Sequence, residues 1–284
     1  MIFVDTFPLI SCLMVTANDR MPHVQRSVRC YLDQTYPNRE LVVVNEGPKD
    51  YQRELDCWLS GLGRNDIRPV WLDGFYTLGS LRNISISMCL GSFYCQWDDD
   101  DFCTPERLAV QYCHLASTGS RACFLGDQLH YYFPTREMYW DNWARYYNGG
   151  HLMNSVIPGT AMVSREVDVR YPSTGKSACA GEDSAFAARL FDDHPDSVSI
   201  LSGRGYMHVY SYHGTNQVYD QDHHRLISYH RSQPREDILR CRSHICTTID
   251  YLGLAETKVM CKDGLVFTST VASEPETRVR RGRP

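Results

Sequence analysis

The first 120 residues alternate between short apolar segments of strand type and longer segments with helical spacing. The strand-type segments are 9–16, 41–44, 67–72 and 93–97. The second of these, LVVV, is rich in β-branched residues, which favour strands. The intervening segments, such as HVQRSVRCYLDQT, repeat apolar residues every three or four positions, as an amphipathic helix does. This alternation predicts an α/β fold with a parallel sheet that helices cover on both faces.

The alternation weakens after residue 120. We expect RACFLGD and HYYF to form the two strands of a hairpin, TAMV and SVSIL to form further short strands, and EDSAFAARLF to form a helix. The predicted fold class is therefore α/β, with a mostly parallel central sheet flanked by helices, a smaller second sheet and a C-terminal extension.

The expected domain organisation follows from the same change of pattern. Residues 1–216 form one domain, whose first half ends at about residue 120, and residues 217–284 form an extension. The arginine-rich end, from about residue 272, is expected to be disordered. It is also interpreted as a cut end, so that the chain would be part of a longer multidomain protein.

Charge and composition exclude several classes of function. The formal net charge of −5 offers no basic field, so nucleic acid is not expected as a partner. No apolar run approaches the roughly 20 residues of a transmembrane segment. The N-terminal stretch lacks a basic start and a cleavage site, so it predicts a core strand rather than a signal peptide. Twelve cysteines without a C-x-x-C pair favour reduced thiols. We therefore expect a cytoplasmic protein, with peripheral attachment to a membrane as the alternative.

Four consecutive aspartates, Asp98–Asp101, directly follow the strand-type segment 93–97. Ligands bind at the carboxyl ends of the strands in such sheets, which places these acids at the rim. Adjacent carboxylates repel each other unless a cation or solvent offsets their charge. Mn²⁺ and Mg²⁺ prefer such oxygens and often share them with phosphate, so the run predicts a seat for a metal–diphosphate complex. A helix is expected directly afterwards, with Thr104 as its N-cap and Pro105 in its first turn.

Five motifs in register resemble those of family 2 glycosyltransferases, which have the GT-A fold (nucleotide-diphospho-sugar transferase-like). They are QTYPN at 34–38, the Arg-Asn helix LGSLRN at 78–83, the D-x-D turn in WDDDDFCTPERL, the E-D motif GEDSAF at 181–186 and YSYHGTN at 210–216. The resemblance covers about residues 8–216. It implies an inverting enzyme that uses Mn²⁺ or Mg²⁺ to move a hexosyl or pentosyl group from a nucleotide-sugar donor to a hydroxyl of a glycan or other acceptor. A UDP-sugar is the favoured donor.

The resemblance also implies residues that bind the donor. Thr16 and Glu46 are expected near the base and ribose, although this chain has Asn45-Glu46 where the family usually has two aspartates. Arg20 and Arg82 are candidates for the nucleotide or diphosphate, because a guanidinium group is planar and always charged.

The metal ligands and the catalytic base follow from the same motifs. Asp100 is expected to be the direct metal ligand, with Asp98 or Asp99 facing the ribose or the metal's water shell. Asp98 is also a candidate ligand. His213 completes the metal shell or contacts the diphosphate, with His208 as its competitor.

The E-D motif supplies the expected base. Asp183 would take the proton from the acceptor hydroxyl, a step that contributes roughly 10²–10⁴-fold. Its neighbour Glu182 lies on another side of the helix and is expected to orient the acceptor or to cap the helix.

Four questions remain open beside this interpretation. The aromatic segment around Trp140 and Trp143 is either a platform for the acceptor or core packing. A non-catalytic carbohydrate-binding relic of the fold, or a sugar nucleotidyltransferase, would make different use of the same residues, although TANDRMPHV lacks the glycine-rich loop of the latter. A zinc site in CRSHIC with His223 and His224 has no standard spacing.

Overall fold

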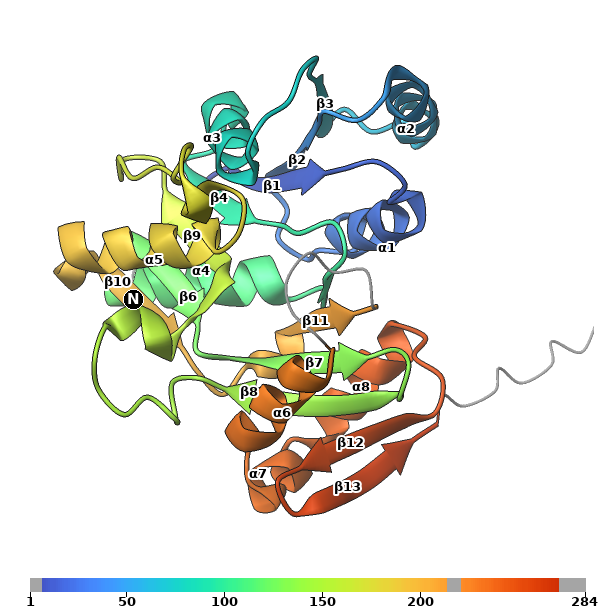
Figure 1. Ribbon diagram of the computed structural model, residues 1–284, viewed down its shortest axis with the longest axis vertical. Coiled ribbons are helices and arrows are strands. Elements are labelled where there is room, and N and C mark those ends of the chain that lie inside the picture. The colour runs from blue at the N-terminus through green and yellow to red at the C-terminus, as the bar shows by residue number, and fades with distance from the viewer. Residues whose placement is uncertain (1–6, 214–220, 271–284) are drawn as a thin grey trace, which may run out of the picture.

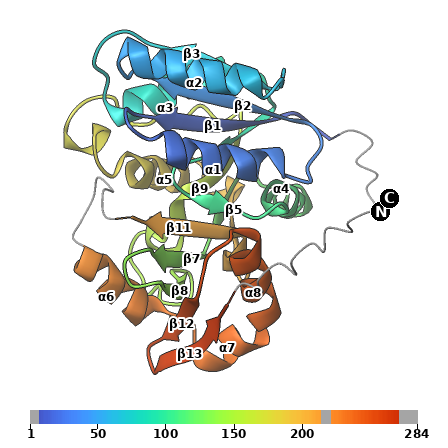
Figure 2. The same cartoon turned by 90° about the vertical axis from the view of Figure 1, so that its right-hand side faces the viewer.

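The computed structural model describes residues 7–213 and 221–270. Figures 1 and 2 show two sheets, with the larger lying above the smaller along the long axis. The expected α/β architecture, with a mostly parallel main sheet and a second sheet, is confirmed. The disorder expected from about residue 272 concerns residues outside the described ranges.

The main sheet has the strand order β10-β6-β9-β4-β1-β2-β3 within the described residues. Its strands are β1 (Ile10–Thr16), β2 (Arg39–Asn45), β3 (Ile67–Trp71), β4 (Phe93–Gln96), β6 (Ala122–Leu125), β9 (Ile157–Ser164) and β10 (Val198–Leu201). Only β9 runs antiparallel to its neighbours in this sheet. The strands expected from the sequence at these positions are therefore confirmed.

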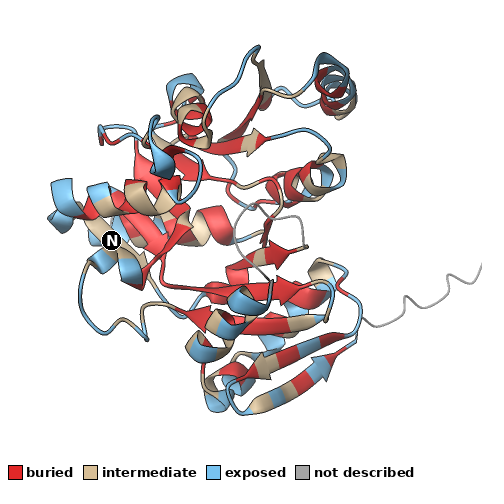
Figure 3. Ribbon diagram, viewed as in Figure 1, coloured by how far each residue is buried: buried red, intermediate tan, exposed pale blue. Residues whose placement is uncertain are grey.

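Helices cover both faces of the main sheet, as predicted. They are α1 (Met21–Leu32), α2 (Lys49–Gly61), α3 (Leu78–Met88), α4 (Arg107–Thr118) and α5 (Glu182–Asp193). Alternate residues of a strand point to opposite faces. Accordingly, Cys12 packs in a cluster with residues of α1, α2 and α4, whereas Leu13 packs with residues of α3 and α5. The strands are mostly buried, and the outer sides of these helices are exposed (Figure 3).

The register of the parallel strands places the C-terminal ends of β1 and β2 side by side at the carboxyl edge of the main sheet. Thr16 at the end of β1 lies opposite Asn45 at the end of β2. The Asn45 side chain donates to the Thr16 carbonyl at 2.8 Å and accepts from the Gly47 amide at 2.8 Å. β4 pairs with the first part of β1 and ends at Gln96, so the four aspartates follow at the same edge.

The second sheet has the order β13-β12-β8-β7-β11-β5 within the described part of the chain. Its strands are β5 (Phe102–Cys103), β7 (Asp127–Tyr132), β8 (Glu137–Asn142), β11 (His208–Tyr212), β12 (Thr257–Cys261) and β13 (Gly264–Ser269). The last helices are α6 (Gln221–Arg231), α7 (Arg235–Arg240) and α8 (Arg242–Tyr251). Short 3₁₀ turns occur at Leu152–Ser155, Lys176–Ala178, Pro195–Ser197 and Gly205–Met207. The residues after 217 thus complete the second sheet.

The predicted hairpin at 121–133 is wrong. β6 pairs with β9 and β10 in the main sheet, whereas β7 pairs with β8 and β11 in the second sheet. Gly126 separates them, and a Cβ atom there would lie 2.5 Å from Ser202 Oγ and 2.8 Å from Ala144 Cβ. The glycine therefore lets the chain cross from one sheet to the other through a tightly packed point.

The predicted cap at Thr104 is also wrong. α4 begins at Arg107 after Glu106, whose side chain does not cap it, and Gln34 Oε1 accepts from the Leu108 amide in the first turn at 3.0 Å. The Thr104 amide instead donates to the Met207 carbonyl at 3.0 Å, and its carbonyl accepts from Gln34 at 2.7 Å. These contacts fix Thr104 against its neighbours, so the helix starts later.

All twelve cysteines are free, in agreement with the expected reduced thiols. None of the helices in the described ranges is both long enough and apolar enough to cross a membrane.

Candidate active site

A pocket of about 240 Å³ opens at the carboxyl edge of the main sheet. Its walls come from the end of β1 and the loop after it, the start of α3, the aspartate run, the residues leading into α5, and Tyr210 on β11. Six carboxylates line it, on Asp98, Asp99, Asp100, Asp101, Glu182 and Asp183. Arg20 and Arg82 are the arginines in its wall. With all groups ionised, the wall therefore carries a formal charge of −4.

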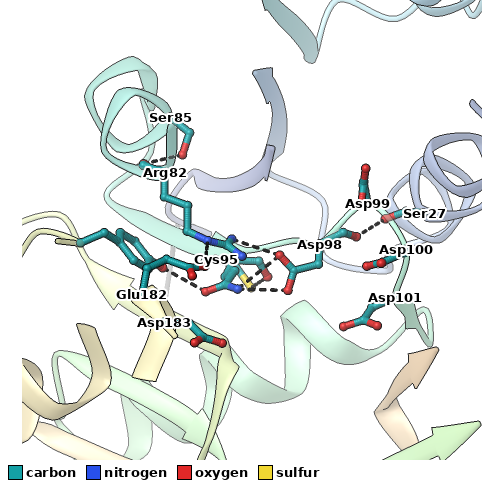
Figure 4. Close-up of polar contacts among 12 residues, drawn as sticks. Ser27, Arg82, Ser85, Cys95, Asp98, Asp99, Asp100, Asp101, Glu182 and Asp183 are labelled. Carbon is teal, nitrogen blue, oxygen red and sulfur yellow. Dashed lines mark hydrogen bonds and ion pairs between the residues drawn. The ribbon is translucent and has the colours of Figure 1, made fainter. Parts of the chain in front are cut away.

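Arg82 on α3 joins the aspartate run to α5. Its Nη1 donates to Asp98 Oδ1 at 3.0 Å and its Nε donates to Glu182 Oε1 at 2.8 Å. Figure 4 shows Asp98 and Glu182 on either side of this guanidinium. Gln96 Nε2 also donates to Asp98, at 3.2 and 3.0 Å, and Tyr171 holds Gln96 through a 3.0 Å bond. Asp98 is thus fixed by groups from three parts of the chain.

Arg20 lies just before α1 and pairs with the middle of the run. Its Nε and Nη2 donate to the two oxygens of Asp99, each at 2.7 Å. Its Nη2 also donates to Asp100 Oδ2 at 2.5 Å. Such a forked pair is among the stronger contacts that a carboxylate makes.

β11 holds the other end of the run. His213 Nε2 lies 3.2 Å from Asp100 Oδ2, and the His213 ring packs on His23 at 4.2 Å between centroids. Asp101 accepts from the Ser211 amide at 3.0 Å, and its other oxygen lies 3.5 Å from His208 Nε2. The two candidate histidines therefore have different partners. His213 faces Asp100, whereas His208 is buried between Asp101 and Gln128.

Burial and crowding shift the pKa values of these acids in different directions. Burial, together with the charge of Asp100, raises the pKa of Asp99 to about 6, and the same effects raise the pKa of Asp101 well above its usual range. For Asp100, burial also acts to raise the pKa, but the bonds from His213 and Arg20 outweigh it and lower the value. Burial, helped by the charge of Glu182, raises the pKa of Asp183 to about 6. Asp100 is thus the acid of these four that stays ionised most readily.

Most of the residues predicted from the sequence meet in this pocket. Its wall includes Arg20, Arg82, Asp98, Asp99, Asp100, Glu182 and Asp183. Thr16 is buried between two wall residues, and its hydroxyl helps to lower the pKa of Asp99. Glu46 is half-buried outside the wall and accepts from the Tyr76 amide at 2.8 Å. Asn216 lies outside the described residues.

Trp140 does not reach the pocket, which corrects its assignment as a platform for the acceptor. Its ring is 2% exposed, and its Nε1 donates to Asp127 Oδ2 at 3.0 Å. Trp143 similarly donates to Asp141 at 2.8 Å, and Arg231 covers its ring. A buried indole cannot stack on a sugar, so core packing is the correct alternative for this segment.

The sequence-based prediction did not include the residues that hold the site residues in place, which are Gln96, Tyr171 and His23. Gln96 carries one usable signal, because it stands at the end of a buried strand just before the acids. Tyr171 and His23 have no comparable signal, since only the fold brings them beside residues distant in sequence.

No group of three or more His, Cys, Asp or Glu residues within 7–213 and 221–270 is arranged to hold a metal ion. This excludes the zinc site around CRSHIC from the described structure. In the pocket, four of the six carboxylates, those of Asp98, Asp99, Asp100 and Glu182, are instead paired with Arg20 or Arg82.

Comparisons with known proteins bear on the family and the fold of the chain. Residues 11–168 match the model of a family described as "Glycosyl transferase family 2". The "Putative colanic acid biosynthesis glycosyl transferase WcaA" of Escherichia coli (strain K12) is 32% identical over 109 residues, which cover 38% of each chain. An "Uncharacterized glycosyltransferase" of Haemophilus influenzae (strain ATCC 51907 / DSM 11121 / KW20 / Rd) is 27% identical over 124 residues, which cover 41% of this chain and 37% of the relative. The chain thus matches less than two fifths of the length of these curated relatives.

Solved structures resemble the fold over most of the chain. S. aureus TarS 1-349 in complex with UDP-GlcNAc has a TM-score of 0.55 at 14% identity, over 86% of this chain and 80% of TarS 1-349. The mannosyltransferase PcManGT from Pyrobaculum calidifontis, in complex with GDP-Man and Mn²⁺, has a TM-score of 0.54 at 13% identity, over 88% of this chain and 71% of its own. These likenesses confirm the GT-A fold. Because the family model matches more than half of its residues, the chain belongs to glycosyl transferase family 2.

Proposed function

We propose that the chain is a metal-dependent, inverting glycosyltransferase. It would move a sugar from a nucleoside-diphosphate sugar, with a UDP-sugar favoured, to a hydroxyl of a glycan or related acceptor. The charge of the pocket carries the proposal. Six carboxylates against two arginines repel a diphosphate unless a cation enters with it. Two proteins of similar fold, TarS 1-349 in complex with UDP-GlcNAc and PcManGT in complex with GDP-Man and Mn²⁺, support this class of ligand.

The residues present fit a divalent ion. Mg²⁺ is usually held by one or two carboxylates together with substrate phosphates, so a ready-made group of three protein ligands is not required. Asp100 and His213 would hold the ion, because they offer a carboxylate oxygen and an imidazole nitrogen 3.2 Å apart, and Asp98 is a further carboxylate in the wall of the pocket that Asp100 lines. The ion supplies Lewis-acid stabilisation of the charge on the leaving diphosphate.

Asp183 is the proposed catalytic base. It stands in the first turn of α5 and lines the pocket, while Glu182 is turned to Arg82 and engaged there. A pKa of about 6 leaves Asp183 ionised at neutral pH and close to the pH of operation, where a general base is most effective. It would take the proton of the acceptor hydroxyl as that oxygen attacks the anomeric carbon from the face opposite the diphosphate.

The donor-binding residues complete the proposal. Arg82 presents a fixed guanidinium at the start of α3, close to Asp98, and is the proposed contact for the donor's diphosphate. Thr16 and Glu46 are proposed to lie near the nucleoside. A loop at the end of β2 carries Glu46, on the edge where the strands end.

A donor screen tests the proposal. The purified chain would be incubated with UDP-, GDP- and dTDP-sugars, with Mn²⁺ or with EDTA, and release of nucleoside diphosphate would be measured. We expect release with one donor class, dependent on Mn²⁺ and lost in Asp100→Ala. Asp192→Ala is the matched control, because Asp192 is an exposed carboxylate on α5 far from the pocket. Metal-independent release would contradict the proposal, and carbohydrate binding without release from any donor would favour the non-catalytic alternative.

A further inference from the structure

Arg20 contacts the oxygen atom of Asp100 that also faces His213, where the proposed metal ion would be held. Asp100 Oδ2 accepts from Arg20 Nη2 at 2.5 Å and lies 3.2 Å from His213 Nε2. A guanidinium group and a divalent ion repel each other, so both cannot sit against this oxygen. Either Arg20 or the ion neutralises Asp100 at a given moment.

The two arginines of the pocket are held differently. Arg82 is clamped between Asp98 and Glu182, which belong to different elements, and its side chain is 10% exposed. Arg20 contacts only the aspartate run among acidic groups, and its side chain is 19% exposed at the pocket wall. Arg20 can therefore turn toward the pocket space by releasing the aspartate run alone, whereas Arg82 would have to release both the aspartate run and α5.

The backbone before Arg20 has an uncommon conformation. Asp19 adopts a φ angle of 59°, in the left-handed region that few residues other than glycine occupy. It belongs to the turn between β1 and α1, and Arg20 is the N-cap position of α1 without a capping side chain. Such strained positions cluster at functional sites, and this one sets the direction in which the Arg20 side chain leaves the turn.

We propose that the guanidinium group of Arg20 neutralises Asp99 and Asp100 in the substrate-free protein, in place of a metal ion. When the metal–donor complex binds, this group moves from Asp100 to the diphosphate. The inference rests on the proposed function, because it takes the ion at Asp100 as its starting point. The fork of Arg20 suits either partner, since guanidinium pairs with carboxylate and with phosphate in the same bidentate way.

This exchange couples metal binding to nucleotide binding. Without a nucleotide, an incoming ion must displace Arg20 into solvent, which weakens metal binding. With a nucleotide, the displaced guanidinium gains a phosphate partner, so the two ligands strengthen each other's binding reciprocally. Arg20 would thereby keep the protein from binding metal before the donor is present.

Binding of Mn²⁺ to the full chain, measured from the free-ion signal in electron paramagnetic resonance, tests the proposal with and without UDP. In the absence of UDP, we expect Arg20→Gln to bind Mn²⁺ about tenfold more tightly than wild type, the equivalent of one lost charge-assisted hydrogen bond. Adding UDP should then strengthen Mn²⁺ binding less in this variant than in wild type. Arg20→Lys, which keeps the charge but not the fork, should fall between them and serves if Arg20→Gln does not fold.

Arg82→Gln is the matched control, since it removes an equal charge from the same pocket without freeing Asp100. If Arg82→Gln increases the affinity for Mn²⁺ less than Arg20→Gln does, the exchange is supported. Equal tightening overturns it, because loss of any positive charge would then suffice. If wild type binds Mn²⁺ with UDP but Arg20→Gln and Arg20→Lys show no gain without UDP, the exchange fails while the proposed function stands. If no form binds Mn²⁺ under any condition, the proposed metal dependence fails with it.

Discussion

The pocket and the second sheet both bury carboxylates, but they provide them with different partners. In the pocket, Arg20 and Arg82 pair with Asp98, Asp99 and Asp100. In the second sheet, Asp127 and Asp141 are fully buried and accept mainly from neutral donors, the indole nitrogens of Trp140 and Trp143. Burial raises the pKa of Asp127 to about 6 and that of Asp141 to about 7.

The difference separates two uses of a buried acid. At Asp100, the contacts from His213 and Arg20 lower the pKa, so this carboxylate remains ionised in the folded protein. Where only neutral donors are present, the charge costs stability and the acid serves to position its neighbours. We therefore expect changes in the pocket to alter activity, and changes in the second sheet to alter the free energy of unfolding.

The largest effect is expected from Asp183→Asn. Removing the proposed base should lower kcat by roughly 10²–10⁴-fold, because the acceptor hydroxyl loses its proton acceptor. Binding of UDP with Mn²⁺, measured by calorimetry, should change little. Asp192→Asn on the same helix should retain full activity. A variant of Asp183 with normal turnover would remove the distinction between the two regions.

The pH dependence of wild-type activity is the next largest effect. Asp183 must be ionised to act as a base, and its pKa is about 6. We expect kcat/KM to fall about tenfold per pH unit below pH 6 and to level off above it. The residual activity of Asp183→Asn should lack this acid limb at Asp183's pKa. If the limb persists unchanged, it belongs to another group, of which Asp99 is the first candidate.

Asp127→Asn should change how stability depends on pH. Because the folded-state pKa of about 6 lies above the ordinary value of 3.8, the native state holds an extra proton between these values. The stability from this group is present below about pH 4 and is lost as the pH rises through 6. The free energy of unfolding of the variant, relative to that of wild type, should therefore increase by about 2–3 kcal/mol from pH 4 to pH 7. Urea unfolding across this range measures the difference, and parallel curves would show that Asp127 is not perturbed.

Trp140→Phe gives the smallest expected effect. The substitution deletes the 3.0 Å bond to Asp127 while keeping an aromatic ring in the core. We expect the free energy of unfolding to fall by about 1–2 kcal/mol at pH 8, where Asp127 is ionised. The fall should be smaller at pH 5, where Asp127 is protonated. Urea unfolding at both values tests this. The same loss at both would mean that packing, not the bond to the carboxylate, is what the indole contributes.

The first 120 residues were predictable because local pattern and fold agree there. A segment such as LVVV is buried on both sides in the main sheet, so its composition alone indicates a strand. The aspartate run was equally visible, since position after a strand determines where it lies. GEDSAF was identified through its family motif, and its helix begins at Glu182 as expected.

The rest depended on contacts between distant residues. Nothing in the sequence near Gly126 shows that the chain changes sheets there, because the reason is the approach of Ser202 and Ala144. Trp140 was misassigned for a similar reason, since an indole that packs on sugar and one that binds a buried Asp127 have the same local sequence. The pairing of Arg20 with Asp99 spans 79 positions and leaves no trace in either segment.

The four aspartates also form one of the covalent connections between the two sheets of the molecule. β4 ends in one sheet and β5 begins in the other, where Phe102 and Cys103 pair with Val209 and His208. An insertion or deletion within this connection would shift that pairing and displace the acids at the same time. Chemistry and architecture are therefore tied to the same few peptide bonds, so both the side chains and the length of this stretch are constrained.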